Sequence, residues 1–286
     1  MESTKSTIST KNIKNIIFSG GGFKCWAYIG TIRVLYEEIL FKNIKSVIGV
    51  SCGSIFGLFY LLQFDYSFLL NHFLQLDIKK YIDIDIDSVI TNQSLVEGKK
   101  FKQLIQECMS KKINPESTFQ ELFDKTGILF TTVAFNITDV KIDYFNKDLT
   151  PYVKVIDAIM ASSALPMLFP AYTISYYKGN EFIDKLYYDG GICNNCPCNL
   201  VNEEETIAFD LSSHSTTTKY NIYSLVLCVT ELLNKQFNNI NKKITFNILD
   251  AKYENETVNL NQSNDDIFNV YMNGYNNTKK IFKKKD

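Results

Sequence analysis

The sequence has little histidine, little arginine and almost no net charge. Its 286 residues include two histidines, His72 and His214, and a single arginine, Arg33. A formal net charge of −1 provides no field to attract nucleic acid, so no nucleic-acid partner is expected. The single arginine beside abundant Lys, Asn, Ile, Tyr and Phe is typical of codon bias in an A/T-rich genome, such as that of a large DNA virus, a protist or certain bacteria.

The sequence also lacks a secretory signal and a long apolar run of the membrane-spanning kind. The first residues, M-E-S-T-K-S-T-I-S-T-K-N, contain no apolar h-region. Residues 47–64 carry no charge, but glycines and serines crowd the first third of this run, so a buried strand and helix explain it better than a span. Seven cysteines, an odd number at irregular spacing, indicate reduced thiols. We therefore expect an intracellular, cytoplasmic protein that can associate peripherally with membranes.

The stretch around Ser51 has the pattern of a reactive serine between a strand and a helix. Gly49-Val50-Ser51-Cys52-Gly53 reads G-x-S-x-G. The β-branched residues before it predict a buried strand, and the apolar residues after it, from Ile55 to Leu62, predict a buried helix. The flanking glycines allow a strained turn that exposes the serine oxygen. The pattern favours Ser51 as a nucleophile, and the alternative is an ordinary turn among small residues.

A second glycine-rich turn, Gly20-Gly21-Gly22-Phe23-Lys24, lies between a predicted strand (Asn15 to Ser19) and a predicted helix. Main-chain N–H groups there can converge on an anion. A dinucleotide fingerprint would need glycine at Cys25, and a P-loop would need G-K-[S/T], which is absent. An oxyanion hole needs only the N–H groups, and a plain tight turn stays an alternative. The two turns are about one βαβ unit apart, so a right-handed crossover places both at the carboxyl end of a parallel sheet.

The rest of the chain mixes helical and extended patterns. Tyr81 to Asp87 alternates Ile and Asp, but it lacks the glycine and glutamate of a calcium loop, so an edge or turn is favoured. His72 is expected to be packed or at the surface. Helices are predicted around Tyr66 to Leu76, Lys99 to Met109, Thr118 onward, Val153 to Ala161 and Tyr223 to Leu233, and strands over Ile128 to Thr138, Lys141 to Asn146, Phe182 to Tyr188, Ile207 to Leu211 and Ile244 to Leu249.

Four blocks in this order resemble the patatin-like phospholipase family. They are the turn at residues 20–24, the G-x-S-x-G block, A-S-S-A-L-P-M-L-F-P at residues 161–170, and Asp189-Gly190-Gly191. The resemblance runs from about Asn15 to Pro197. It departs from the family pattern at Ser19, at Cys25 and after Gly191, where Asn194-Asn195-Cys196-Pro197 is one residue longer than usual.

The resemblance implies a three-layer α/β/α fold with a central, mostly parallel sheet. It also implies a Ser–Asp dyad, with Ser51 as nucleophile and Asp189 as base, and an oxyanion hole at Gly20, Gly21 and Gly22. Lys24 would support the glycine loop or meet a phosphate. The implied activity is phospholipase A-type hydrolysis of acyl lipids at a transiently contacted membrane surface, without cofactor or metal. The alternatives are a non-catalytic lipid-binding module and a serine esterase with a His214 triad.

Two regions stay outside this assignment. Cys193, Cys196 and Cys198 contain a C-x-x-C spacing, but no second pair exists, so free thiols are favoured over zinc. We expect residues 1–13 to be a polar leader, residues 14–211 to form the catalytic domain, and residues 212–286 to be an extension packed on it. The end of that extension, K-K-I-F-K-K-K-D, is expected to be a frayed basic tail, with contact to an anionic membrane as the alternative.

Overall fold

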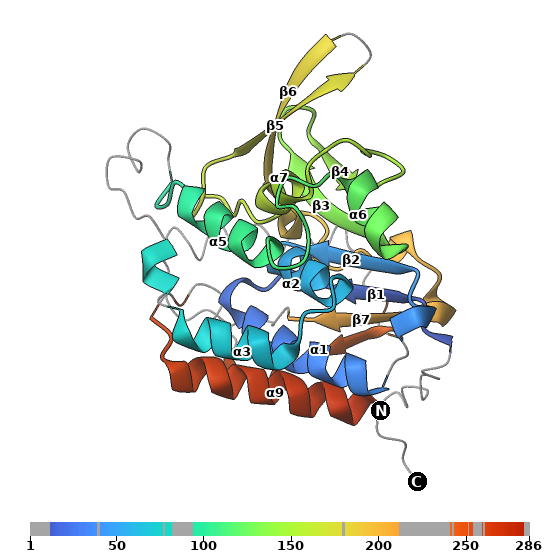
Figure 1. Cartoon of the computed structure of the whole chain (residues 1–286), viewed down its shortest axis with the longest axis vertical. Helices are drawn as coiled ribbons and strands as arrows, with labels where there is room; N and C mark the ends of the chain where they lie inside the picture. The colour runs from blue at the N-terminus through green and yellow to red at the C-terminus, as the bar shows by residue number, and fades with distance from the viewer. Residues whose placement is uncertain are drawn as a thin grey trace.

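The chain forms an α/β fold around a mixed sheet (Figure 1). The computed structural model describes residues 12–38, 41–76, 78–81, 94–178, 181–211, 241, 243–250, 252–253, 259 and 261–282. The strands of its eight-stranded sheet are β1 Asn15–Phe18, β2 Ser46–Val50, β3 Leu129–Asn136, β4 Lys141–Phe145, β5 Tyr172–Lys178, β6 Glu181–Asp189, β7 Thr206–Asp210 and β8 Thr245–Asn247.

One half of the sheet is parallel and forms its buried centre. Strands β3, β2, β1, β7 and β8 lie side by side in that order, all parallel. Ile16 and Phe18 pack into the main apolar core, whereas Ile17 faces a second cluster on the opposite side. Because both faces are covered, these strands are nearly continuous apolar runs, as their sequences predicted. The expected α/β fold with a mostly parallel central sheet is confirmed.

The other half of the sheet is antiparallel. β4 and β6 both pair antiparallel with β3, and β5 pairs with β6 along its whole length. The β5–β6 hairpin projects from the body of the protein, at the top of Figure 1. The sequence analysis did not predict β5, because it ended the proline-broken loop at Tyr172.

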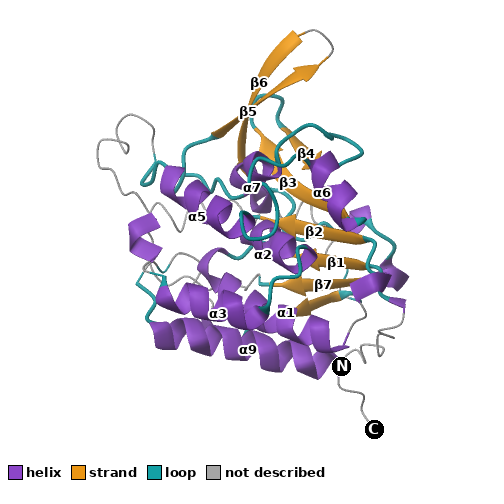
Figure 2. Cartoon of the chain, viewed as in Figure 1, coloured by secondary structure: helices purple, strands orange, loops and turns teal. Residues whose placement is uncertain are grey.

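Helices pack beside the sheet and beside one another (Figure 2). The helices used below are α1 Ala27–Glu38, α2 Cys52–Leu61, α3 Tyr66–Gln75, α5 Lys99–Met109, α6 Phe119–Thr126, α7 Val155–Ser162 and α9 Asn264–Phe282. Two short 3-10 helices, η2 Gly22–Trp26 and η5 Gly190–Ile192, follow β1 and β6.

Local sequence signals fix several helix ends. Asp65 caps α3 by accepting the main-chain N–H of Ser67. Thr118 and Glu121 form a capping box at the start of α6, and Gly127 ends that helix with φ 66°. These caps explain why the starts predicted for α3 and α6 lie within a residue of the observed ones, and the bounds predicted for α5 match those observed.

The long helix α9 packs along α1, with α3 beside them (Figure 1). A Cβ on Gly274 would lie 2.3 Å from the main-chain oxygen of Ala27, and one on Gly30 would lie 2.4 Å from that of Tyr271. The two glycines therefore allow the helix backbones to approach closely. Because α9 extends through Phe282, residues 279–282 belong to a helix, and the expected fraying does not apply to them.

The apolar run at residues 47–64 is a buried strand and helix, as expected. β2 supplies its first part, and every residue of α2 is buried in the core. Within the described part of the chain, no helix combines the length and the apolar character that crossing a bilayer requires. The predictions for residues 82–87, for His214 and for the helix at Tyr223 to Leu233 lie outside the described residues.

Candidate active site

Ser51 lies at a tight turn between β2 and α2, at the N-terminus of the helix. Its backbone has φ 53° and ψ −130°, a left-handed conformation that is strained for a residue with a side chain. A Cβ on Gly49 would lie 2.3 Å from Ser54 Cα, and one on Gly53 would lie 2.3 Å from the main-chain oxygen of Phe18. Both glycines of the G-x-S-x-G motif are thus required by the close approach of the backbone.

The strand register brings Asp189 to Ser51. β2 ends with Val50 paired to Val133 of β3, and β6 ends with Asp189 paired to the next β3 residue, Ala134. Because β4 pairs with both of those β3 residues along the other edge, β2 and β6 meet end to end on one edge of β3. Ser51, which follows β2, and Asp189, the last residue of β6, therefore lie next to each other beside β3.

A short hydrogen bond joins the two side chains. Ser51 Oγ donates to Asp189 Oδ2 at 2.6 Å, and the N–H of Gly191 donates to Asp189 Oδ1 at 2.7 Å. Ser51 is 8% exposed and Asp189 is 4% exposed. Gly190 allows this close packing, since a Cβ there would lie 2.2 Å from the main-chain oxygen of Val133. Both oxygens of the carboxylate thus have a donor, although the group is removed from bulk water.

The same burial sets the acidity of the carboxyl group. Burial raises the pKa of Asp189 from its ordinary 3.8 to about 7, while the hydrogen bonds from Ser51 and from the Gly191 N–H limit the rise. A carboxylate with a pKa near 7 is a stronger proton acceptor than an exposed aspartate, yet much of it is ionised at neutral pH. The pair can therefore move a proton from a hydroxyl to a carboxylate.

The glycine turn after β1 borders Ser51. A Cβ on Gly20 would lie 3.1 Å from Ser51 Cβ. Gly21 precedes η2, and Gly22 has φ 56°, which favours glycine. Among the hydrogen bonds between described residues, none is donated by the main-chain N–H of Gly20, Gly21 or Gly22. Gly20 is thus the residue of this turn that borders Ser51, and an anion site beside the serine would use main-chain N–H groups of this kind.

Two polar side chains that the sequence analysis did not interpret hold this turn in place. Asn195 Nδ2 donates to the carbonyl oxygen of Gly20 at 3.2 Å, and its Oδ1 would lie 2.8 Å from a Cβ on Gly191. Buried Ser19 accepts the N–H of Leu211 at 2.9 Å through its Oγ. Ser19 and Asn195 both lie where the sequence departs from the family pattern. That departure was the one feature of the sequence that could have drawn attention to them.

The other predicted site residues have different surroundings. Lys24 is buried at 4% exposure in η2, and its main-chain N–H donates to the oxygen of Gly21 at 3.3 Å. His72 packs within α3, with Nε2 3.6 Å from Cys108 Sγ, and burial lowers its pKa. His214 lies outside the described residues.

The cysteines described by the structure are free and buried. Cys196 Sγ lies 3.7 Å from Cys198 Sγ, and the Cys198 sulfur lies 3.5 Å from Thr245 Oγ1. Burial raises the pKa of Cys25, which contacts Cys52, the residue after Ser51. Within the described ranges, no group of three or more His, Cys, Asp or Glu side chains could hold a metal ion.

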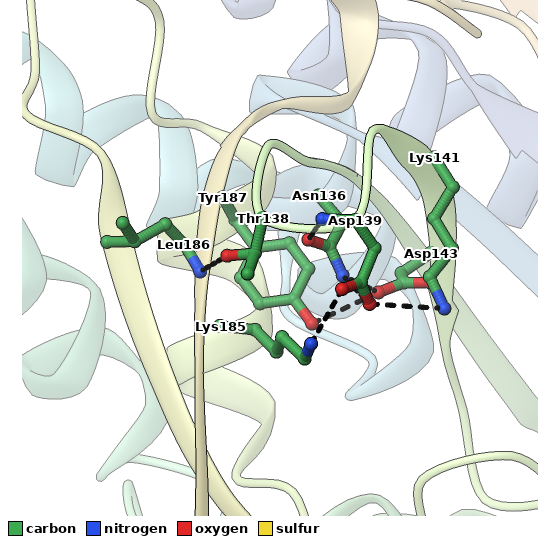
Figure 3. Close-up of polar contacts among 8 residues, drawn as sticks. All are labelled: Asn136, Thr138, Asp139, Lys141, Asp143, Lys185, Leu186 and Tyr187. Carbon is green, nitrogen blue, oxygen red and sulfur yellow. Dashed lines mark hydrogen bonds and ion pairs between the residues drawn. The ribbon is translucent and has the colours of Figure 1, made fainter.

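A polar cluster attaches β6 to the β3–β4 hairpin, just before β6 reaches the site (Figure 3). Asp139 accepts from Lys185 Nζ at 2.6 Å, and Asp143 accepts from the hydroxyl of Tyr187 at 3.1 Å. The hydrogen bond from Lys185 holds the pKa of Asp139 below its ordinary value. Tyr187 is two residues before Asp189, so these contacts fix the strand that carries the carboxylate.

Comparisons with known proteins identify the family and the fold of the chain. Residues 16–201 match the sequence profile of the family described as patatin-like phospholipase. "Probable lipid hydrolase 463L" of Invertebrate iridescent virus 6 is 27% identical over 266 residues, which are 90% of this chain and 83% of that protein. "Uncharacterized protein R571" of Acanthamoeba polyphaga mimivirus is 26% identical over 227 residues, 74% of this chain and 70% of that protein.

Solved structures share the fold. VipD from Legionella pneumophila superposes with a TM-score of 0.57 and 17% identity, over 95% of this chain and 67% of that chain. The type III effector protein ExoU superposes with a TM-score of 0.53 and 13% identity, over 95% of this chain and 53% of its own. At these identities the likeness concerns the fold alone. Since the profile match spans more than half of the sequence, the chain belongs to the patatin-like phospholipase family.

Proposed function

We propose that the protein is a lipid acyl hydrolase of phospholipase A type, which cleaves fatty-acyl esters of glycerophospholipids through a Ser51–Asp189 dyad. The observation that carries the proposal is the 2.6 Å hydrogen bond from Ser51 Oγ to a buried carboxylate. Membership of the family and the viral relative named as a probable lipid hydrolase support the same chemistry. The substrate would be reached by transient contact with a membrane or micelle surface.

Acylation uses the geometry of the dyad directly. Asp189 takes the hydroxyl proton while Ser51 Oγ attacks the ester carbonyl carbon, which forms a tetrahedral oxyanion. The main-chain N–H groups of Gly20, Gly21 and Gly22 stabilise that oxyanion from the turn beside the serine. When the carbon–oxygen bond to the lipid breaks, Asp189 returns its proton to the leaving alcohol. The products of this step are an acyl-serine and a lysolipid.

Deacylation repeats these steps with water. Asp189 takes a proton from the attacking water, the same N–H groups hold the second oxyanion, and Ser51 recovers its proton as the fatty acid leaves. No step requires a metal ion, so we expect hydrolysis to continue in the presence of a chelator.

Fatty-acid release from mixed phospholipid vesicles tests the proposal. Wild type and Ser51→Ala are compared with and without EDTA, and labelling by a fluorophosphonate reports the nucleophile independently. We expect release by the wild type that survives EDTA and is lost in Ser51→Ala. If the wild type neither releases fatty acid nor reacts with the fluorophosphonate, the protein is a non-catalytic lipid-binding module and the proposal fails.

Substitution of the base separates the dyad from a triad. Asp189→Asn should reduce turnover about a thousandfold, whereas His214→Ala should leave it unchanged. The opposite pattern would assign the protein to the serine esterases with a histidine base. Because His214 lies in a polar L-S-S-H-S-T-T-T sequence without a companion motif, we favour the dyad.

A further inference from the structure

The end of helix α7 contacts the backbone of the proposed nucleophile. Ser162, the last residue of α7, is fully buried, and its Oγ accepts the main-chain N–H of Ser51 at 2.8 Å. An N–H can only donate, so the Ser162 hydroxyl acts here as the acceptor. The contact joins residues that are 111 positions apart in the sequence.

The same short segment also contacts the proposed base. The carbonyl oxygen of Ala164 accepts the main-chain N–H of Asp189 at 2.9 Å. Ser162 and Ala164 thus fix the backbones of Ser51 and Asp189 from one segment, while the side chains of that pair bond to each other at 2.6 Å. The separation of the proposed nucleophile and base is therefore set by these two hydrogen bonds as well as by the strands.

We propose that Ser162 is a positioning residue, whose hydroxyl holds Ser51 in the strained backbone conformation that directs its Oγ at Asp189. This inference rests on the proposed function of the dyad and adds a residue that touches neither substrate nor reacting atoms. It assigns a role to the second residue of the A-S-S-A-L-P block.

The strain at Ser51 explains why the acceptor matters. A residue with a side chain stays at φ 53° only if its surroundings over-determine that conformation. Without the Ser162 oxygen, the buried N–H of Ser51 would lose its acceptor, and rotation of this peptide toward another acceptor would become favourable. Such rotation moves Oγ relative to Asp189, and a displacement of about 1 Å can reduce turnover about a hundredfold.

The adjacent serine provides a matched control. Ser163 is also buried, at 8% exposure, and its Oγ has no hydrogen-bond partner among the described residues. Ser162→Ala and Ser163→Ala each remove one buried hydroxyl from the same turn, so they differ chiefly in the contact to Ser51. Ser162→Thr keeps the hydroxyl and serves as the rescue variant, and Ser162→Cys keeps the volume with a weaker acceptor.

The variants are compared by vesicle hydrolysis, by the rate of fluorophosphonate labelling and by thermal unfolding of the full chain. For Ser162→Ala we expect kcat and the labelling rate to fall about 10- to 100-fold with KM nearly unchanged. Ser163→Ala should retain wild-type rates, and Ser162→Thr should recover most of the loss. If Thr is too large for the site, Ser162→Cys should lie between wild type and Ser162→Ala.

The pH profile distinguishes positioning from general support of the fold. The hydrogen bond from Ser51 lowers the pKa of Asp189, so its loss in Ser162→Ala should move the acidic limb of kcat/KM to higher pH. Ser163→Ala should leave that limb in place. Loss of stability without a change in this limb would show a structural role and overturn the inference.

Failure of this inference can be distinguished from failure of the proposed function. If Ser51→Ala is inactive while Ser162→Ala keeps wild-type kcat and labelling, Ser162 does not position the nucleophile although the dyad stands. If Ser51→Ala is fully active, the proposed function fails and the inference fails with it.

Discussion

Replacing Asp189 by asparagine should change stability and activity in opposite directions. In the folded protein the pKa of this carboxyl group is raised by burial from 3.8 to about 7, so the folded state holds the proton more tightly than the unfolded chain. Below about pH 3.8 the carboxyl group is protonated in both the folded and the unfolded state, and no stability is lost. As pH rises from about 4 to about 7, the free energy of unfolding should fall, and above pH 7 the loss is complete.

The size of this effect follows from the difference in pKa. At 1.36 kcal/mol per pH unit, a rise from 3.8 to about 7 corresponds to roughly 4 kcal/mol of lost stability at pH 8. Asparagine has the same shape and no charge, so Asp189→Asn should be more stable than wild type at pH 8, by up to about 4 kcal/mol. At pH 4 the two proteins should be nearly equal in stability. Hydrolysis should fall about a thousandfold, because the base is gone.

Urea unfolding of wild type and Asp189→Asn between pH 4 and pH 8.5 measures the difference between their free energies of unfolding. The titration of other groups is common to both proteins and cancels in this difference. Ser51→Ala is the control, since it abolishes activity but keeps the carboxyl group. A stability difference that stays constant across this range would refute the raised pKa, whatever the variant does to activity. In the wild type, kcat/KM should rise with pH until about pH 7 and then level off, because the ionised carboxylate is the proposed base.

Three further substitutions and one control variant test how the site and the fold are packed. Gly53→Ala should lower the free energy of unfolding by about 3 kcal/mol or prevent folding, since its Cβ would meet main-chain oxygens at 2.3 and 2.4 Å. Gly57→Ala in the same helix is the control, because the nearest contact of its Cβ would be a side-chain carbon at 3.3 Å. In urea unfolding it should change the free energy of unfolding by less than about 1 kcal/mol. Asn195→Ala should reduce kcat about tenfold in the vesicle assay, because the 3.2 Å bond to the oxygen of Gly20 is lost, and unchanged kcat would contradict this role. Gly274→Ala should lower the midpoint of thermal unfolding, since its Cβ would lie 2.3 Å from a main-chain oxygen of α1; an unchanged midpoint would mean that the close approach of α9 is not needed for stability.

The local pattern of the sequence predicted most of the elements but not all of them. Helix α9 was missed because asparagines interrupt its composition, although Ile267, Val270, Tyr271 and Gly274 are buried at helical spacing. Strand β5 was missed because its alternating side chains follow a proline-rich loop. Both segments owe their conformation to a partner, α1 for the helix and β6 for the strand, and a local window of sequence does not contain that partner.

The candidate site was predicted at the level of residues and not of contacts. The G-x-S-x-G motif singled out Ser51, the family resemblance implied Asp189 as its base, and the β–turn–helix pattern predicted the elbow. The 2.6 Å bond between them depends on β2 and β6 meeting on the same edge of β3, and that register is a tertiary property. The raised pKa of Asp189 likewise results from burial by distant segments. The contact of Ser162 had no sequence signal beyond its place in a family block, and that of Asn195 had none beyond the departure from the family pattern after Gly191.

Burial of Asp189 connects the reactivity of the site to the stability of the fold. An exposed aspartate with a pKa near 4 would be a weak base toward a serine hydroxyl, whereas removal from water raises its proton affinity. The same removal makes the ionised form destabilising at neutral pH. The N–H of Gly191 and the hydroxyl of Ser51 offset part of this cost, and the Lys185–Asp139 contact fixes the strand that holds the carboxyl group. In the proposed dyad, Asp189 would therefore be a base of strength similar to that of a histidine, provided that the fold is stable enough to keep the carboxylate dry.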